Sequence, residues 1–168
     1  MKPIKLVYDK YENDLGFYHE DIDSTIEDRE TLKGEILKLL PEMVSGNAIN
    51  KDRHFKIFTW GIKKGPGTDC DLIFDATTFQ TKIDSELDVH SLNGFSEEIQ
   101  DSIILHPKFL EIIERIVNTI EEKKPRTVGF YCNHGKHRSV GWAEIMKKYY
   151  YKNTTVKHLC SPRKNTRQ

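Results

Sequence analysis

The stretch from residue 128 to residue 150 constrains the fold most, because a strand pattern, a polar loop and a helix pattern follow one another without a break. The apolar run Val128-Gly-Phe-Tyr131 predicts a strand, and the residues after Ser139 carry apolar side chains at helical spacing. Between them lies Cys-Asn-His-Gly-Lys-His-Arg-Ser, residues 132–139. Such a loop directs backbone N–H groups and the positive end of the helix dipole at one point. The loop is therefore expected to bind an anion.

Length and composition favour one globular domain. The chain has 168 residues, of which 37% are hydrophobic, and it has no linker-like stretch that would divide it. No apolar run reaches membrane-spanning length, and the N-terminus lacks the pattern of a secretory signal. The three cysteines are widely spaced and odd in number, which suits neither a disulfide framework nor a structural metal site. We expect a cytoplasmic protein that does not enter membranes.

Hydrophobic periodicity predicts an α/β fold. Helices are expected from Ser24 towards Met43, with Pro41 as an earlier stop, and from Pro107 to Glu121. Strands are expected at 4–8, 15–18, 55–60, 72–74, 127–131 and 154–159, and a helix at 139–150. The last strand, helix and strand imply a parallel pair joined by a right-handed crossover. The predicted architecture is a mixed or parallel sheet with flanking helices and a phosphate-binding loop at a strand-to-helix junction.

Charge is strongly segregated along the chain. From Lys123 to Gln168 there are twelve Lys or Arg residues and one acid, Glu144, whereas the first fifty residues contain six basic and eleven acidic residues. A basic third of this kind attracts phosphates or nucleic acid. The alternative is a pair of oppositely charged solvated faces. The candidate RNA-binding residues are Lys147, Lys148, Lys152, Arg163, Lys164 and Arg167, and the neighbouring aromatics Trp142, Tyr149, Tyr150 and Tyr151 are candidates for stacking on bases, although some must belong to the core.

The loop is compatible with a second chemistry. Cys-x5-Arg-Ser has the spacing of cysteine-dependent phosphatases, in which a thiolate attacks phosphorus and the arginine holds phosphate oxygens. Cys132 would be the nucleophile, and the acid that protonates the leaving group would come from Asp75, Asp84, Asp88 or Asp101. The competing interpretation is that Cys132 is a small buried residue at the end of a strand.

Several separated blocks resemble the C-terminal domain of the RapZ family. They are Phe58-Thr-Trp-Gly-Ile-Lys-Lys-Gly-Pro, Asp69-Cys-Asp-Leu-Ile-Phe-Asp75, Cys132 with Gly135-Lys-His-Arg-Ser-Val140, and Val156-Lys-His158. The resemblance covers about residues 54–168 and leaves residues 1–53 as an N-terminal extension, expected to pack on the core. It implies a domain that senses an amino-sugar phosphate, binds small regulatory RNA, helps present that RNA to an endoribonuclease, and forms a homodimer. The kinase-like domain of full-length members has no counterpart here, since the chain contains no Gly-x4-Gly-Lys-Ser/Thr.

The resemblance also transfers a set of ligand-binding positions. After Asp75 the chain departs from the family pattern, because Ala76-Thr-Thr-Phe-Gln80 replaces an Arg and a Pro-rich segment ending in His-Trp. The sugar specificity is therefore not implied, whereas the anion loop is. The candidate ligand-binding residues are Asp75, Cys132, Asn133, His134, Gly135, Lys136, His137, Arg138 and Ser139.

We therefore predict a regulatory or adapter domain that binds a sugar phosphate or nucleotide at residues 132–139, and RNA through its basic surface. It would need no catalysis and no cofactor. The alternative is a phosphatase or other hydrolase that uses Cys132 on a phosphomonoester or nucleotide. A third possibility is a protein-interaction module in which the loop is structural. A metal site at His134 and His137 is not expected, because no third ligand is spaced to join them.

Overall fold

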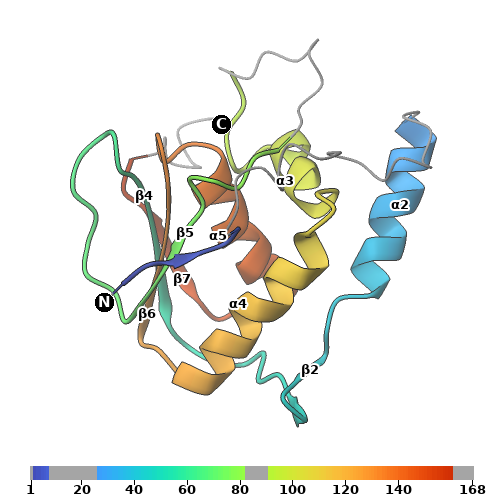
Figure 1. The fold of residues 1–168 in the computed structure, drawn as a ribbon, viewed down its shortest axis with the longest axis horizontal. Helices are drawn as coiled ribbons and strands as arrows, with labels where there is room; N and C mark the ends of the chain where they lie inside the picture. The colour runs from blue at the N-terminus through green and yellow to red at the C-terminus, as the bar shows by residue number, and fades with distance from the viewer. Residues whose placement is uncertain (1, 8–25, 82–90, 161–168) are drawn as a thin grey trace.

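The protein is built around one parallel sheet. The computed structural model describes residues 2–7, 26–81 and 91–160 (Figure 1). The sheet has five strands in the order β1-β5-β6-β4-β7, and every neighbouring pair is parallel. The strands are β1 (Ile4–Lys5), β4 (Lys56–Gly61), β5 (Leu72–Asp75), β6 (Thr127–Cys132) and β7 (Thr155–His158). The predicted α/β class is confirmed, and the sheet is parallel rather than mixed.

Four helices and a small hairpin complete the described part of the chain. The helices are α2 (Ile26–Lys38), α3 (Glu97–Ile104), α4 (Phe109–Lys123) and α5 (Arg138–Tyr149), and the hairpin joins β2 (Met43–Val44) to β3 (Asn47–Ala48). Figure 1 shows α2 at the outer edge of the molecule, beside α3. Within the described ranges no helix is both long and apolar enough to cross a membrane.

Local apolar patterns predicted most of these elements, with three differences. The first predicted helix ends at Lys38, before Pro41, and residues 43–48 form the hairpin instead of a helical end. Helix α3 was not predicted. The strands β6 and β7 are parallel, as predicted, but β4 lies between them and pairs with both. The strand predicted at 15–18 lies outside the described residues.

The core lies between the sheet and the helices. Side chains alternate along the strands, so that Ile57, Phe74 and Phe130 point into the core, while Trp60 and Tyr131 stack on the opposite face with ring centroids 5.7 Å apart. Helix α5 packs on β4 and β6. The stripe along α4 is fully apolar and buried: Phe109, Ile112, Ile113, Ile116, Val117 and Ile120. Of the aromatics considered for base stacking, Trp142, Tyr150 and Tyr151 are buried in the core, which leaves Tyr149.

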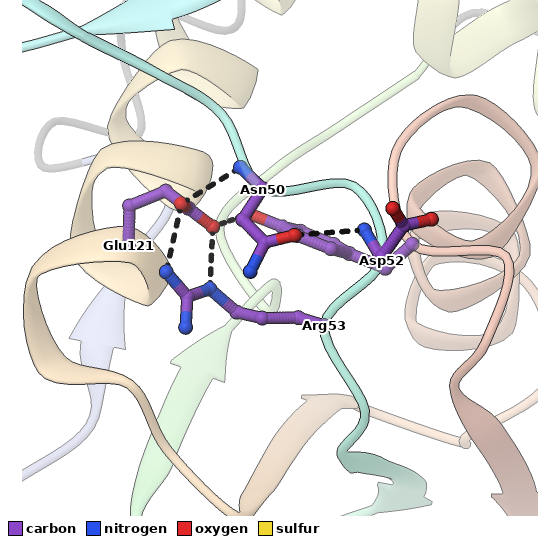
Figure 2. A network of polar contacts seen from close by, with 5 residues as sticks. Asn50, Asp52, Arg53 and Glu121 are labelled. Carbon is purple, nitrogen blue, oxygen red and sulfur yellow. Dashed lines mark hydrogen bonds and ion pairs between the residues drawn. The ribbon is translucent and has the colours of Figure 1, made fainter.

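A carboxylate at the end of α4 joins three parts of the chain (Figure 2). Glu121 Oε1 accepts hydrogen bonds from the Asn50 backbone N–H (3.0 Å) and from Arg53 Nη2 (2.9 Å), and Oε2 accepts from Arg53 Nε (2.8 Å) and Tyr151 Oη (2.8 Å). Burial acts to raise the pKa of Glu121, but the hydrogen bonds from Arg53, Asn50 and Tyr151 hold it below its ordinary value. The segment before β4 is thereby fixed to α4 and to the turn that follows α5.

The described parts of residues 1–53 contact the rest of the chain directly. Leu6, Val7, Ile36, Val44 and Ile49 are buried in the same hydrophobic core as the sheet. In addition, the guanidinium of Arg115 on α4 donates to the backbone oxygens of Lys5 and Leu6. Packing therefore runs continuously across residue 53, and a domain boundary there stays a prediction.

His106 gives the fold a specific sensitivity to acid. The ring is 4% exposed, packs 4.5 Å from Phe79 between ring centroids, and its Nδ1 accepts the Lys108 N–H (3.0 Å). Burial, aided by the charge of Lys108, lowers the pKa of His106 to about 4. An unfolded histidine binds its proton near pH 6.5, so this site's contribution is complete above that pH and is lost as the pH falls towards 4.

We predict that the free energy of unfolding falls by roughly 3 kcal/mol through this site between pH 7 and pH 4. Urea denaturation at a series of pH values measures the effect. His106→Gln should flatten the slope between pH 6.5 and 4, whereas His54→Gln, at an exposed histidine, should leave it unchanged. An identical slope in His106→Gln and the unaltered protein would contradict this assignment.

Candidate functional site

The loop between β6 and α5 is wrapped around the sulfur of Cys132. The backbone N–H groups of Gly135 and Ser139 donate to Cys132 Sγ at 3.3 and 3.5 Å, and the thiol itself donates to Ser139 Oγ at 3.2 Å. Cys132 is 2% exposed and Ser139 is fully buried. The amides that meet at the sulfur come from the loop and from the first turn of α5, where the helix dipole adds positive potential.

Two glycines bring the loop across the end of β4. The pairing of β4 with β6 continues beyond the strands, with the Ile62 N–H donating to Cys132 O and the Lys63 N–H to Asn133 O, both at 3.0 Å. A Cβ at Gly61 would lie 2.2 Å from the carbonyl carbon of His134. Gly135 has φ +71°, a conformation that favours glycine. The sequence therefore permits a close contact that any side chain at residue 61 would prevent.

Arg138 is engaged with the backbone that follows β5. Its Nη1 donates to the carbonyl oxygens of Ala76 (3.3 Å), Thr77 (2.8 Å) and Phe79 (3.0 Å). The guanidinium thus fixes the beginning of α5 to residues 76–79. Sequence reasoning assigned Arg138 to an anion and missed this structural role, which depends on a contact some sixty residues away in the chain.

Asp75 is held on the other face of the sheet from the sulfur. Its Oδ1 accepts hydrogen bonds from the backbone N–H (2.8 Å) and the hydroxyl (2.6 Å) of Thr77. It is the register partner of Tyr131, and burial, together with the charge and hydrogen bond of Asp75, raises the pKa of Tyr131 to about 12. Because side chains alternate along β6, Cys132 points to the opposite face from Tyr131.

Of the other candidate acids, the structure describes only Asp101, which is engaged in a contact of its own. Asp101 lies on α3 and forms an ion pair with Lys33 of α2, with Nζ 2.6 Å from Oδ1. Burial raises the pKa of Asp101, and the hydrogen bond and charge of Lys33 oppose this rise. Asp84 and Asp88 lie outside the described residues.

The second half of the loop is anchored to the segment before α3. The Gly94 N–H donates to Lys136 O (2.8 Å), and His137 Nε2 lies 2.9 Å from Leu92 O. His134 is exposed, whereas the side chains of Asn133, Lys136 and His137 are half-buried. The predicted loop residues are thus gathered in one place, with residues 92–95 as their outer wall.

The predicted RNA-binding lysines lie at the far end of α5. Lys147, Lys148 and Lys152 line a cleft with α2 and α3, and the exposed residues among them are Lys148 and Lys152. Lys147 donates to Thr154 O, and the Lys148 ammonium lies 5.3 Å from the centroid of the Tyr149 ring. Arg163, Lys164 and Arg167 lie outside the described residues.

A polar chain next to the loop was not predicted from the residues. Thr59 Oγ1 lies 2.7 Å from His158 Nδ1, and His158 Nε2 lies 2.9 Å from Glu144 Oε2. A carboxylate only accepts, so Nε2 carries the proton and, in the neutral ring, Nδ1 accepts from the hydroxyl. Thr59 is fully buried and the His158 side chain is 8% exposed, so these hydrogen bonds connect β4, β7 and α5 in the interior of the protein. The signal in the sequence was that Thr59 and His158 both lie in blocks of the family resemblance.

Comparison with known proteins agrees with that resemblance. A family model described as the RapZ C-terminal domain matches residues 53–164. The chain belongs to the RapZ C-terminal domain family. The match leaves α2 and the hairpin outside the family domain and includes the loop, Asp75 and the Thr59, His158 and Glu144 chain.

Three similar proteins are each named "Nucleotide-binding protein". The one from Azotobacter vinelandii is 30% identical over 146 residues, which is 79% of this chain and 48% of the relative. Those from Rubrobacter xylanophilus and Thermosipho melanesiensis are 28% and 27% identical, with 66% and 65% of this chain and 37% and 42% of the relatives covered. The chain thus spans less than half the length of these relatives.

Gly94 in this RapZ C-terminal domain tests how tightly the loop is held against its outer wall. A Cβ at residue 94 would lie 2.3 Å from Gly141 N and 2.4 Å from Val140 Cβ. We predict that Gly94→Ala costs about 1 to 3 kcal/mol of stability, since α5 is too well packed to yield. Gly34→Ala is the matched control, because it lies in α2 with open space around its Cβ position, and it should be neutral or slightly stabilising.

Urea denaturation of the two variants measures the difference, and hydrogen exchange at the Gly135 and Ser139 amides reports on the loop. We expect faster exchange at both amides in Gly94→Ala only. Equal stability of Gly94→Ala and the unaltered protein would show that the segment does not hold the loop.

Proposed function

We propose that the loop of residues 132–139 binds a phosphorylated ligand, either a sugar phosphate or a nucleotide, in a regulatory or adapter role. The observation that supports this proposal is the convergence of two backbone N–H groups on Cys132 Sγ at the start of α5. N–H groups at a helix N-terminus that meet an electron-rich atom are also suited to an anion, and Lys136 and His137 lie in the same turn.

The names of the relatives support a nucleotide as the ligand, whereas the sequence does not choose between a nucleotide and a sugar phosphate. The three similar proteins are named for nucleotide binding, but each has more than half of its length outside the region that matches this chain. Their name therefore supports a nucleotide without locating it. The departure from the family pattern after Asp75 removes the implied sugar specificity, so the remaining amides and cations of the loop do not distinguish a sugar phosphate from a nucleotide.

Binding is favoured over hydrolysis by the position of the candidate catalytic groups. The nucleophile of a phosphatase has to reach phosphorus, whereas Cys132 is 2% exposed. The Nη1 of Arg138 is directed at three carbonyl oxygens, and Asp75 lies across the sheet from the sulfur. A cysteine-dependent hydrolase is the alternative that the following experiment separates from binding.

Calorimetric titration with inorganic phosphate, sugar phosphates and nucleotides tests the proposal. We predict that Cys132→Ser keeps the affinity for the best ligand within about tenfold, or 1.4 kcal/mol, because the amides and cations remain. Lys136→Gln should weaken binding by more than that, while Lys123→Gln, at an exposed lysine on α4, should not. If the protein releases phosphate and Cys132→Ser abolishes this release, the protein is a hydrolase. If Lys136→Gln binds with unchanged affinity, the ligand does not bind at the loop.

RNA binding through the basic C-terminal third is the second candidate. It is supported by the twelve basic residues after residue 122 and by the exposure of Lys148 and Lys152 at the end of α5. With this function we also propose the homodimer and the cytoplasmic location that the sequence implies. The three free thiols of Cys70, Cys132 and Cys160 are compatible with a reducing compartment.

We predict that RNA binding weakens steeply with salt, because each neutralised phosphate releases counterions. Replacing Arg163, Lys164 and Arg167 by alanine should reduce the slope of log affinity against log salt and weaken different RNAs alike. Gel-shift titrations at several salt concentrations measure both effects. Binding that does not respond to salt would exclude the basic surface as the contact.

A further inference from the structure

A cleft of about 650 Å³ lies between α2, α3 and the C-terminal end of α5. It is separate from the loop and lies partly outside the family domain, since α2 precedes residue 53. Its size falls in the range of small-molecule sites. The cleft is lined by lysines from α2, α5 and the turn after α5, by carboxylates from α3 and α5, and by the rings of Phe95 and Tyr149.

We propose that this cleft binds a nucleoside phosphate. Lys148 and Lys152 are exposed at one side and would contact the phosphate. Phe95 and Tyr149 offer ring surfaces to a base. On the α3 side, the carboxylate of Asp101 would accept hydrogen bonds from ribose hydroxyls. The side-chain amide of Gln100 would form hydrogen bonds with the edge of the base.

Other anions use this lining less well. Inorganic phosphate would leave the rings and the carboxylates without a function. A long polyanionic strand would meet Glu97, Asp101 and Glu144, three acids that line the same cleft as the lysines. A ligand with one anionic end and an uncharged, hydrogen-bonding aromatic end could place its phosphate at Lys148 and Lys152 and its base and sugar near α3.

Helix α2 forms the outer wall, and its Lys33 forms two ion pairs with carboxylates of α3. The Lys33 ammonium lies 2.6 Å from Asp101 Oδ1 and 3.7 Å from Glu97 Oε1. Lys33 therefore partly neutralises the acidic side, which reduces the repulsion that those carboxylates would exert on a phosphate. Lys147 donates to Thr154 O, so Lys148 and Lys152 are the better candidates for direct phosphate contact.

Gly94 separates the cleft from the loop and is hydrogen-bonded to both. The side chain of Gln100 donates through Nε2 to Gly94 O (2.9 Å), and the Gly94 N–H donates to Lys136 O (2.8 Å). The two sites are therefore neighbours, and the experiment has to alter the cleft and the loop in separate variants. The cleft proposal does not depend on the proposed function of the loop.

Calorimetric titration of the full chain with AMP, ADP, ATP and inorganic phosphate tests the proposal. We expect the paired variant Lys148→Gln with Lys152→Gln to weaken nucleotide affinity at least about tenfold, through loss of charged contacts to phosphate. The matched control is Lys56→Gln with Lys157→Gln, two exposed lysines on the sheet that lie outside the cleft. The control pair should bind nucleotide within twofold of the unaltered protein.

The opposite pattern would overturn the proposal. Nucleotide affinity that falls in Lys136→Gln but not in the cleft pair would assign the nucleotide to the loop, and would support the proposed function. Absence of nucleotide binding to the unaltered protein would exclude the cleft site, while the loop would still be tested by sugar phosphates. Equal affinity for AMP and inorganic phosphate would show that the rings and carboxylates contribute nothing, and would also exclude it.

Discussion

The contact between Gly61 and the loop at His134 and Gly135 is the constraint on which the rest of the site depends. Because neither glycine has a Cβ, the loop crosses the end of β4 at backbone distance and continues the β4 to β6 hydrogen bonds beyond both strands. This crossing turns the Gly135 N–H towards the Cys132 sulfur. The same turn places the start of α5 so that the Ser139 N–H meets the sulfur from the other side. The fold thus directs two backbone N–H groups at one buried sulfur.

A sulfur at this centre is compatible with two chemistries, and its surroundings separate them. In a phosphatase the amides would stabilise a thiolate, the arginine would hold the phosphate, and an acid would stand on the leaving-group side. Here the hydroxyl of Ser139 and the two amides surround a buried sulfur, Arg138 binds the backbone of residues 76–79, and Asp75 is occupied by Thr77 on the other face. Arg138 and the groups around the sulfur fix the loop, whereas Asp75 is held away from it, and we infer from this arrangement a binding site rather than a reacting one.

Local patterns carried much of the fold, and long-range contacts account for what they missed. The strand, loop and helix around Cys132 were predicted closely because apolar runs and glycine punctuation act over a few residues. Helix α3 was missed although Ile99, Ile103 and Ile104 are buried, because its eight residues are too few for a clear period. The partners of Arg138 and the face occupied by Asp75 depend on strand order, since β5 lies next to β6 in the sheet. No local pattern specifies that order.

Charge segregation along the chain did not predict which charges meet. Although the N-terminal third is acidic, three of its cations make charged or cation–π contacts with the rest of the chain: Lys33 pairs with Asp101, Arg53 pairs with Glu121, and the Lys51 ammonium lies 5.3 Å from the Tyr150 ring centroid. The exposed acids Glu30 and Glu35 of α2 stay at the surface. As a result, the lysines at the end of α5 face carboxylates across a cleft rather than open solvent alone. Inside the cleft, such a mixed field favours small ligands with separated polar groups over long polyanions, because further phosphates of a strand would meet Glu97, Asp101 or Glu144. The RNA contact proposed for Lys148 and Lys152 would then be made at the rim of the cleft, where both lysines are exposed.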